Sequence, residues 1–325
     1  MLALLIDGNN MAYRARHSCS LSHNGKDTSV LYGMIKMLAS LITKRNPDHV
    51  IVAWDIGVPL YRRELIPAYK ANRRYDDDLE RAGFIDQMNE LYSTLGDFGV
   101  LQLRRRGIEA DDFLHHASAM LKGQSIIVSS DNDLMQSVSD NVSVLKPANT
   151  GKAETLVTMD NFETITGVPV KRYVLYKVLQ GDSSDNIPGC RGIGPKYASV
   201  ATNAVNSDRT MIHDVIFALR SSLTGRLRIF FNDGAYRKSY DTINLKRDRT
   251  GARYCILNAP WTVYNSKQAR AWCMDNGFVS ISKITLGAVF GRLTRPEFDS
   301  SGIIPYVWDY RRTPLEEVNL RSKSV

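Results

Sequence analysis

The segment LALLIDGNN at residues 2–10 decides the fold, because it joins a short apolar run to a carboxylate and a turn. A continuous apolar run that stops at Asp7 is typical of a strand buried on both faces. The same pattern returns twice, and both copies end at an acidic residue: HVIVAW before Asp55 and SIIVSS before Asp131. We therefore predict buried strands that each deliver an acidic side chain to their carboxyl end.

Helical patterns alternate with these strands. Residues 28–45 carry apolar side chains at helical spacing, and residues 84–95 and 109–121 also read as helices. Residues 100–103 read as a further strand. This alternation predicts an α/β fold with a mostly parallel central sheet flanked by helices. In such sheets ligands bind beyond the carboxyl ends of the strands, where the acidic residues are expected.

The pattern changes after Pro147. One more strand is predicted at residues 154–158, and the segments that follow read mainly as helices: 159–167, 170–180, 197–204 and 209–222. A glycine-rich turn interrupts them at residues 189–194. We therefore divide the chain into an α/β domain at 1–180, a helical lobe at 181–290 and a C-terminal extension at 291–325.

Composition narrows the function classes. The 325 residues include 42 Lys or Arg and 34 Asp or Glu, so the formal net charge is +8. A basic excess favours a polyanionic partner such as nucleic acid, although many basic proteins bind none. No apolar run approaches the ~18 residues that a membrane span needs, and no signal peptide is recognisable. The cysteines at 19, 190, 255 and 273 form no CxxC pair, so neither a disulfide scaffold nor a zinc site is indicated.

Acidic residues recur at the ends of the apolar runs. They are Asp7, Asp55, Glu109, Asp111, Asp112, Asp131, Asp133, Asp182 and Asp185. Any one of them could simply be a helix cap or a turn residue. Many carboxylates at one end of a buried sheet repel each other unless cations neutralise them. Ligation by oxygen alone favours Mg²⁺ or Mn²⁺, and two such ions are a standard device for displacement at phosphorus.

At this point the chain resembles a known family. The matching segments, in chain order, are LIDGNNMAYR at 5–14, AWD at 53–55, YR at 61–62, YKANR at 69–73, IEADD at 108–112, SDNDL at 130–134, GDSSDNIPG at 181–189 and GIGPK at 192–196. Together they are similar to the structure-specific 5′ nuclease (flap endonuclease) family of tailed bacteriophages and of the N-terminal domain of bacterial DNA polymerase I. Beyond residue 205 the resemblance is limited to ARAW at 269–272 and GF at 277–278.

The resemblance implies a PIN-like 5′ nuclease fold with two Mg²⁺ ions, for which Mn²⁺ can substitute. By position, the residues expected around the first ion are Asp7, Asp55, Glu109, Asp111, Asp131 and Asp133. Asp182 and Asp185 would hold the second ion, with Asp131 or Asp133 bridging, and Asp112 would contribute indirectly or through water.

The resemblance also implies a helical arch at about residues 67–96, through which a 5′ single strand passes. Lys70 and Arg73 would stabilise charge on the scissile phosphate, Tyr69 would stack on the terminal base, and Arg62 would contact phosphate. From the residues alone, without the resemblance, this polar stretch reads as a solvated helix or a mobile loop.

Residues 189–196 resemble the hairpin of a helix-three-turn-helix that grips duplex DNA and, in the family, often binds K⁺. Gly192 and Gly194 would allow close backbone approach, and Lys196 would meet the phosphates. A lone GxG is otherwise only a turn. Three residues elsewhere are expected to pack rather than act, namely Trp54, His115 and His116, and the basic run at 104–106 is read as solvated.

The resemblance therefore implies a Mg²⁺-dependent 5′-3′ exonuclease and flap endonuclease that acts on branched or nicked DNA and RNA/DNA and removes RNA primers and 5′ flaps. We expect a free-standing monomer of the cytoplasm, or of the host cytoplasm if a phage encodes it. A single-strand DNA-binding protein or a replisome polymerase is the expected protein partner, and no membrane is expected. The alternatives are a PIN-like single-strand ribonuclease and a branched-DNA-binding protein without activity.

Overall fold

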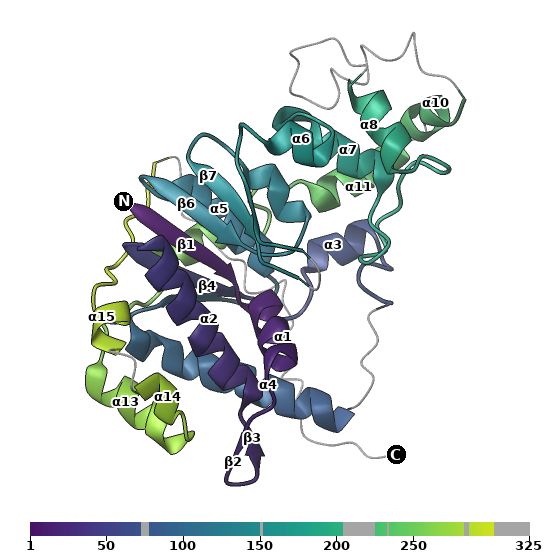
Figure 1. Cartoon of the computed structure of the whole chain (residues 1–325). Helices are drawn as coiled ribbons and strands as arrows, with labels where there is room; N and C mark the ends of the chain where they lie inside the picture. Colours follow the sequence, from purple (N-terminus) through teal and green to yellow (C-terminus); the bar gives the residue numbers. More distant parts are fainter. Residues whose placement is uncertain (73–77, 150–151, 204–224, 233, 283–285, 302–325) are drawn as a thin grey trace.

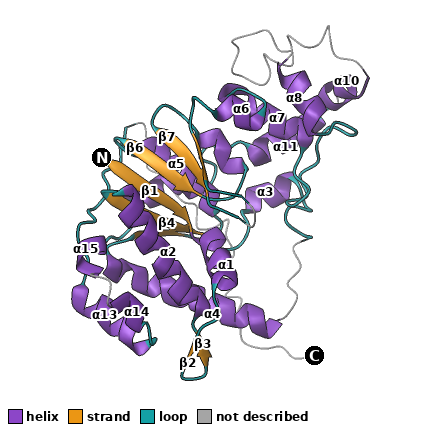
Figure 2. Ribbon diagram, in the orientation of Figure 1, coloured by secondary structure: helices purple, strands orange, loops and turns teal. Residues whose placement is uncertain are grey.

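The central sheet of the protein is six-stranded and mostly parallel (Figures 1 and 2). The computed structural model describes residues 1–72, 78–149, 152–203, 225–232, 234–282 and 286–301. Its strands are β1 (Leu2–Asp7), β4 (His49–Trp54), β5 (Leu101–Arg104), β6 (Gln124–Val128), β7 (Val142–Lys146) and β8 (Thr155–Val157). They lie in the order β5-β4-β1-β6-β7-β8, and only β8 runs antiparallel to its neighbour. The predicted fold class is confirmed.

Alternation along each strand sends side chains to both faces of the sheet. In β1, Leu4 and Ile6 pack against α1 (Gly8–Ser18), α2 (Ser29–Arg45) and α4 (Asp78–Thr94). Ala3 and Leu5 pack on the opposite face against α5 (Ala110–Met120). Because both faces are covered, the central strands β1 and β4 are buried almost throughout, as their continuous apolar runs predict.

Three short elements complete the sheet domain. A two-stranded hairpin, β2 (Ser22–His23) and β3 (Lys26–Asp27), links α1 to α2. The turn η1 (Leu95–Phe98) follows α4, and the turn η2 (Asp133–Ser137) follows β6. The sequence reading did not anticipate α1, the hairpin or β7.

A separate hydrophobic core joins a group of helices outside the sheet. It is built from α3 (Leu60–Leu65), α7 (Tyr173–Gln180), α8 (Pro195–Asn203), α10 (Gly225–Asn232) and α11 (Ala235–Ile243), with the turn after α3. The helix α6 (Phe162–Thr166) and the turn η3 (Val170–Arg172) connect this lobe to β8. The helix predicted at 209–222 lies outside the described residues.

The chain then returns to the sheet. α12 (Ala252–Leu257) packs beside α5, and α13 (Ser266–Asp275), α14 (Val279–Ser282) and α15 (Leu286–Phe290) pack beside α2 and α4 (Figure 1). The described residues of the segment expected as one lobe at 181–290 are thus distributed over three hydrophobic clusters, one in the helical lobe and one on each face of the sheet. No helix within the described part of the chain is both long and apolar enough to cross a membrane.

Candidate functional site

The acidic residues that follow the strands meet at the carboxyl end of the sheet. Asp7 ends β1, and the neighbouring strands β4 and β6 lead to Asp55 and Asp131. Asp111 lies in the first turn of α5, which begins after β5. Burial raises the pKa of Asp111 well above its usual value, and the charges of Asp131, Asp7 and Asp55 raise it further. These carboxylates are therefore close enough to repel one another at the carboxyl end of the sheet.

Asp7 accepts two hydrogen bonds in this arrangement. One carboxylate oxygen accepts the backbone N–H of Asn10 at 3.0 Å and so caps α1, while the other accepts Ser129 Oγ at 2.7 Å. Burial, followed by the charge of Asp55, nevertheless raises the pKa of Asp7 to about 7. The helix can start directly behind this carboxylate because Gly8 has no side chain, since a Cβ there would lie 2.6 Å from the Trp54 ring.

Asp55 is held from both sides. Its backbone N–H donates to Asn9 Oδ1 at 3.0 Å, and its Oδ1 accepts the backbone N–H of Ala110 at 2.7 Å. Asp55 thus connects the turn after β1 to the first turn of α5. Asn9 and Ser129 were not singled out from sequence, although both lie in the predicted turns at the strand ends.

Glu109 and Asp112 belong to a buried ion-pair network. The guanidinium of Arg62 donates to the two oxygens of Asp112 at 2.9 and 3.0 Å and also to Glu109, while its Nε donates to the Thr242 carbonyl at 3.2 Å. Arg62 is only 2% exposed. Protein oxygens engage the guanidinium of Arg62 here, and its expected phosphate contact stays a prediction.

Tyr69 and Lys70 reach the same glutamate. The Tyr69 hydroxyl donates to Glu109 Oε2 at 3.0 Å, and the ring is buried, so its stacking on a base stays a prediction. Lys70 Nζ lies 2.5 Å from Glu109 Oε1 and 3.7 Å from Asp185 Oδ2. Burial raises the pKa of Glu109, but Arg62 and then Lys70 outweigh it and hold the pKa below its usual range.

The start of the expected arch is not helical. Residues 67–72 form turns, and Lys70 has a left-handed backbone with φ of +56°. Arg73 itself lies outside the described residues, whereas α4 covers the predicted helix at 84–95.

The loop at residues 181–189 carries Asp182 and Asp185. The two ends of the loop are held together, because Cys190 N–H donates to the Leu179 carbonyl. Gly181 also packs on the backbone of Gly189, and a Cβ on Gly181 would lie 2.4 Å from the Gly189 backbone nitrogen. Within the loop, Asp182 and Ile187 exchange both backbone hydrogen bonds, at 2.8 and 2.9 Å.

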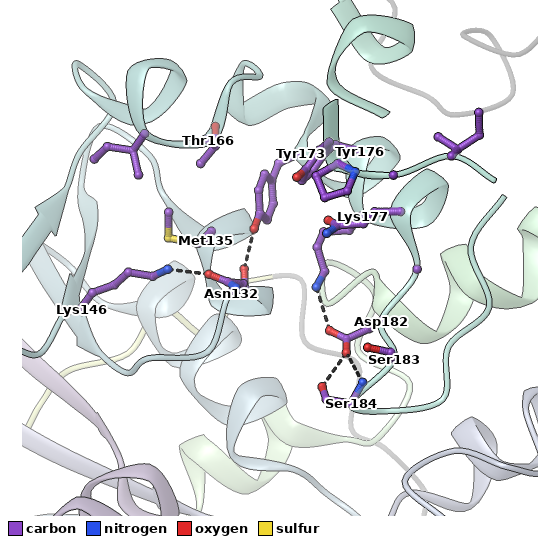
Figure 3. A pocket seen from close by; sticks show the side chains of 16 residues that line it. Asn132, Met135, Lys146, Thr166, Tyr173, Tyr176, Lys177, Asp182, Ser183 and Ser184 are labelled. Carbon is purple, nitrogen blue, oxygen red and sulfur yellow. Dashed lines mark hydrogen bonds and ion pairs between the residues drawn. The ribbon is translucent and has the colours of Figure 1, made fainter. Parts of the chain in front are cut away.

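Lys177 joins this loop to the sheet, and sequence reasoning missed it. Its Nζ lies 2.9 Å from Asp133 Oδ1 and 2.9 Å from Asp182 Oδ2, and Figure 3 shows the second of these contacts. Burial raises the pKa of Asp133 to about 6 even though Lys177 opposes that shift. The available signal was a lysine within the apolar helix segment YVLYKVLQ, five residues before Asp182.

A cavity of about 590 Å³ adjoins Lys177 on α7. Asn132, Lys146, Tyr173 and Asp182 are among its lining residues (Figure 3). Lys146 Nζ donates to Asn132 Oδ1, and the Tyr173 hydroxyl donates to the Asn132 carbonyl at 3.1 Å. The cavity is therefore polar where it approaches the carboxylates.

The donor set fits hard divalent cations, because its members are carboxylates, and burial together with neighbouring carboxylates raises the pKa values of Asp7, Asp111 and Asp133. In the described part of the chain, however, no three His, Cys, Asp or Glu side chains are arranged to hold an ion as they stand. Lysines and hydrogen bonds occupy several of the oxygens instead.

The remaining predicted residues lie away from this cluster. Gly192, Gly194 and Lys196 are exposed around the start of α8, and their DNA contacts stay predictions. The imidazole of His115 forms a buried hydrogen bond with Ser137 Oγ at 2.8 Å, and His116 and Trp54 are also buried. These three positions agree with the expected packing roles.

Comparison with known proteins identifies the family. Residues 2–167 match the model of the 5′-3′ exonuclease N-terminal, resolvase-like domain. The chain belongs to the 5′-3′ exonuclease family. It is 32% identical over 204 residues to a 5′-3′ exonuclease of Bacillus subtilis, an alignment that covers 60% of this chain and 67% of that protein.

Two further proteins are similar to this 5′-3′ exonuclease family member. One is much longer than the aligned region, and the other shares the fold at low sequence identity. DNA polymerase I of Mycobacterium bovis is 32% identical over 232 residues, which cover 69% of this chain but only 25% of the polymerase. The flap endonuclease of bacteriophage T5, solved with DNA and metal ions, shares the fold with a TM-score of 0.62 and 19% identity, covering 87% of this chain and 100% of that chain.

Proposed function

We propose that this protein is a divalent-metal-dependent 5′-3′ exonuclease and flap endonuclease that hydrolyses phosphodiester bonds of branched or nicked DNA and RNA/DNA. The observation that carries the proposal is the meeting of Asp7, Asp55, Asp111 and Asp131 at the carboxyl end of a parallel sheet. Membership of the 5′-3′ exonuclease family supports it. The biological role proposed is the removal of RNA primers and 5′ flaps during replication.

We assign one divalent ion to Asp7, Asp55, Asp111 and Asp131, and a second to Asp133, Asp182 and Asp185. Mg²⁺ is proposed as the natural ion, because all of these ligands are oxygens. When bound, such ions supply a water nucleophile of lowered pKa and neutralise charge on phosphate. The role of the protein is to hold the carboxylates in place. Ser129, Asn9 and the first turn of α5 perform this role.

Lys70 is proposed to stabilise negative charge that develops on the scissile phosphate. Its ammonium group lies beside Glu109 at the edge of the carboxylate cluster, where a phosphate held by the ions would also lie. The exposed start of α8, with Lys196, is proposed to hold duplex backbone, because a helix N-terminus and a lysine both favour phosphate.

The test is single-turnover cleavage of a 5′-labelled flap with Mg²⁺. Asp131→Asn should abolish cleavage but leave flap binding within several-fold of wild type, because the proposed phosphate grip lies elsewhere. Asp140→Asn, which removes an exposed carboxylate before β7, is the matched control and should cleave normally. Metal-dependent turnover by Asp131→Asn would overturn the metal assignment.

The same assay separates Lys70 from the alternatives. Lys70→Ala should lower the rate at saturating enzyme by about 100-fold, the scale for loss of one preorganised charge-stabilising donor. A change in affinity alone would make Lys70 an ordinary phosphate contact. Cleavage of linear single-stranded RNA in preference to the flap would favour the ribonuclease alternative, and binding without cleavage would favour the branched-DNA-binding alternative.

A further inference from the structure

Two lysines tie the 181–189 loop to the sheet in the same way. Lys70 approaches Glu109 of the sheet domain and Asp185 of the loop, and Lys177 approaches Asp133 and Asp182. Each ammonium group thus lies between one carboxylate from each side. The Lys177 bridge is the tighter of the two, because both of its distances are 2.9 Å, whereas the Lys70 distances are 2.5 and 3.7 Å.

Lys177 is buried among apolar neighbours. The residue is 5% exposed, and the residues beside it on α7, Leu175, Val178 and Leu179, pack in the lobe core. Burial alone would lower the pKa of Lys177, but Asp133 and Asp182 outweigh it and raise the pKa above its usual value. The side chain is therefore a fixed internal cation rather than a surface lysine that meets carboxylates by chance.

We propose that Lys177 is a built-in counter-cation that competes with a divalent ion for Asp133 and Asp182. The proposal rests on the proposed function, which assigns the second ion to these carboxylates. An ammonium group and a divalent ion both bind carboxylate oxygens, and they cannot share the space between Asp133 and Asp182. Binding of the second ion then requires Lys177 to leave.

The cavity beside α7 provides a place for the displaced side chain. Lys177 lines this cavity together with Gln180, Ser183 and Tyr176, so its ammonium group can turn from Asp182 towards polar groups without crossing the lobe core (Figure 3). The protein should therefore bind one divalent ion readily and the second only at higher concentration.

Calorimetric titration of the DNA-free protein with Mn²⁺ tests this competition without any measurement of cleavage. Lys177→Met removes the competing charge, so the second ion should bind at least about tenfold more tightly. The first ion should keep its affinity within about twofold, because its ligands are other carboxylates. Lys177→Arg keeps a cation and should keep the weak second site. Lys171→Met, which removes an exposed lysine from the turn before α7, should leave both affinities unchanged.

The outcomes separate this inference from the proposed function. If wild type binds no divalent ion, the proposed function fails. If wild type binds two ions and Lys177→Met leaves the second affinity unchanged or weaker, the counter-cation role is overturned while the proposed function stands.

A measurement on wild type covers the case in which Lys177→Met does not fold. In protein labelled with ¹⁵N-lysine, the buried ammonium signal that Lys177→Arg lacks should change at the second equivalent of Mg²⁺ and not at the first. A signal that stays constant through both equivalents would overturn the proposal.

Discussion

Arg62 shows how a single residue fixes the chemistry of its neighbours. Its bidentate pair with Asp112 and its contact with Glu109 give two buried carboxylates a cationic partner beside the sheet. Buried ion pairs add little net stability when they form, but removing one partner strands a charge. Arg62 is therefore a structural requirement of the site.

Arg62→Met should lower the free energy of unfolding by about 3–5 kcal/mol, because it leaves Asp112 buried without its partner. Arg62→Lys should recover only part of this loss, since an ammonium group cannot form the same bidentate pair. Arg63→Met, at the exposed neighbouring position, should change stability by less than about 0.5 kcal/mol. Urea denaturation measures all three, and equal midpoints for Arg62→Met and Arg63→Met would contradict the assigned role.

The acidic residues could be placed from sequence, but their cationic partners could not. Asp7 and Asp55 end continuous apolar runs, and that local pattern predicts their position at the sheet edge. Arg62 and Glu109 lie 47 residues apart, and no local periodicity predicts their contact. For the same reason, the contacts that Arg62 and Tyr69 make with Glu109 could not be predicted from sequence.

Among the elements, the long and strongly periodic segments were predictable. The strand at 49–54 and the helix at 28–45 agree with the structure to within one residue. β7 was missed because its short VSVLK segment is bounded by polar residues and depends on pairing with β6. The return of α13–α15 to the sheet was also missed, because it depends on contacts distant in sequence.

These returning helices are expected to stabilise the sheet domain itself. Phe278, which is 1% exposed, packs edge-on against Tyr32 of α2 and against Trp272, which donates to Glu90 of α4 at 3.0 Å. Phe278→Ala should therefore lower the free energy of unfolding by about 3–5 kcal/mol.

The control is Val279→Ala at a neighbouring position that is 51% exposed, where the change should be less than about 0.5 kcal/mol. Hydrogen exchange locates the effect. Amides of β1 and β4 should exchange faster in Phe278→Ala, whereas faster exchange confined to α13 and α14 would show that this segment is an independent unit.

For the molecule as a whole, a buried histidine should make stability depend on pH. Burial, followed by the charge of the neighbouring His116, lowers the pKa of His115 to about 3. In the unfolded chain His115 has an ordinary histidine pKa of ~6.5. Between the two pKa values it therefore binds a proton that it does not bind in the folded protein. Stability should therefore fall as pH decreases from about 6.5 towards 3, by up to about 1.4 kcal/mol per pH unit for this group.

Unfolding free energies of wild type and His115→Gln across this pH range measure the contribution. The variant should show a shallower decline, because glutamine does not titrate. His17→Gln, which removes an exposed histidine, should follow wild type. Parallel profiles for wild type and His115→Gln would mean that other groups govern the acid sensitivity.

The joined ends of the 181–189 loop have a consequence for how the molecule responds. Gly181 and Gly189 cross without room for a side chain, and Asp182 and Ile187 are hydrogen-bonded to each other inside the crossing. The loop therefore has little freedom to bend internally. Its backbone carries both Asp182, which meets Lys177, and Asp185, whose carbonyl accepts the Lys70 N–H at 3.1 Å. We therefore expect a change at Asp182 to be transmitted to Asp185 and Lys70 through the loop backbone.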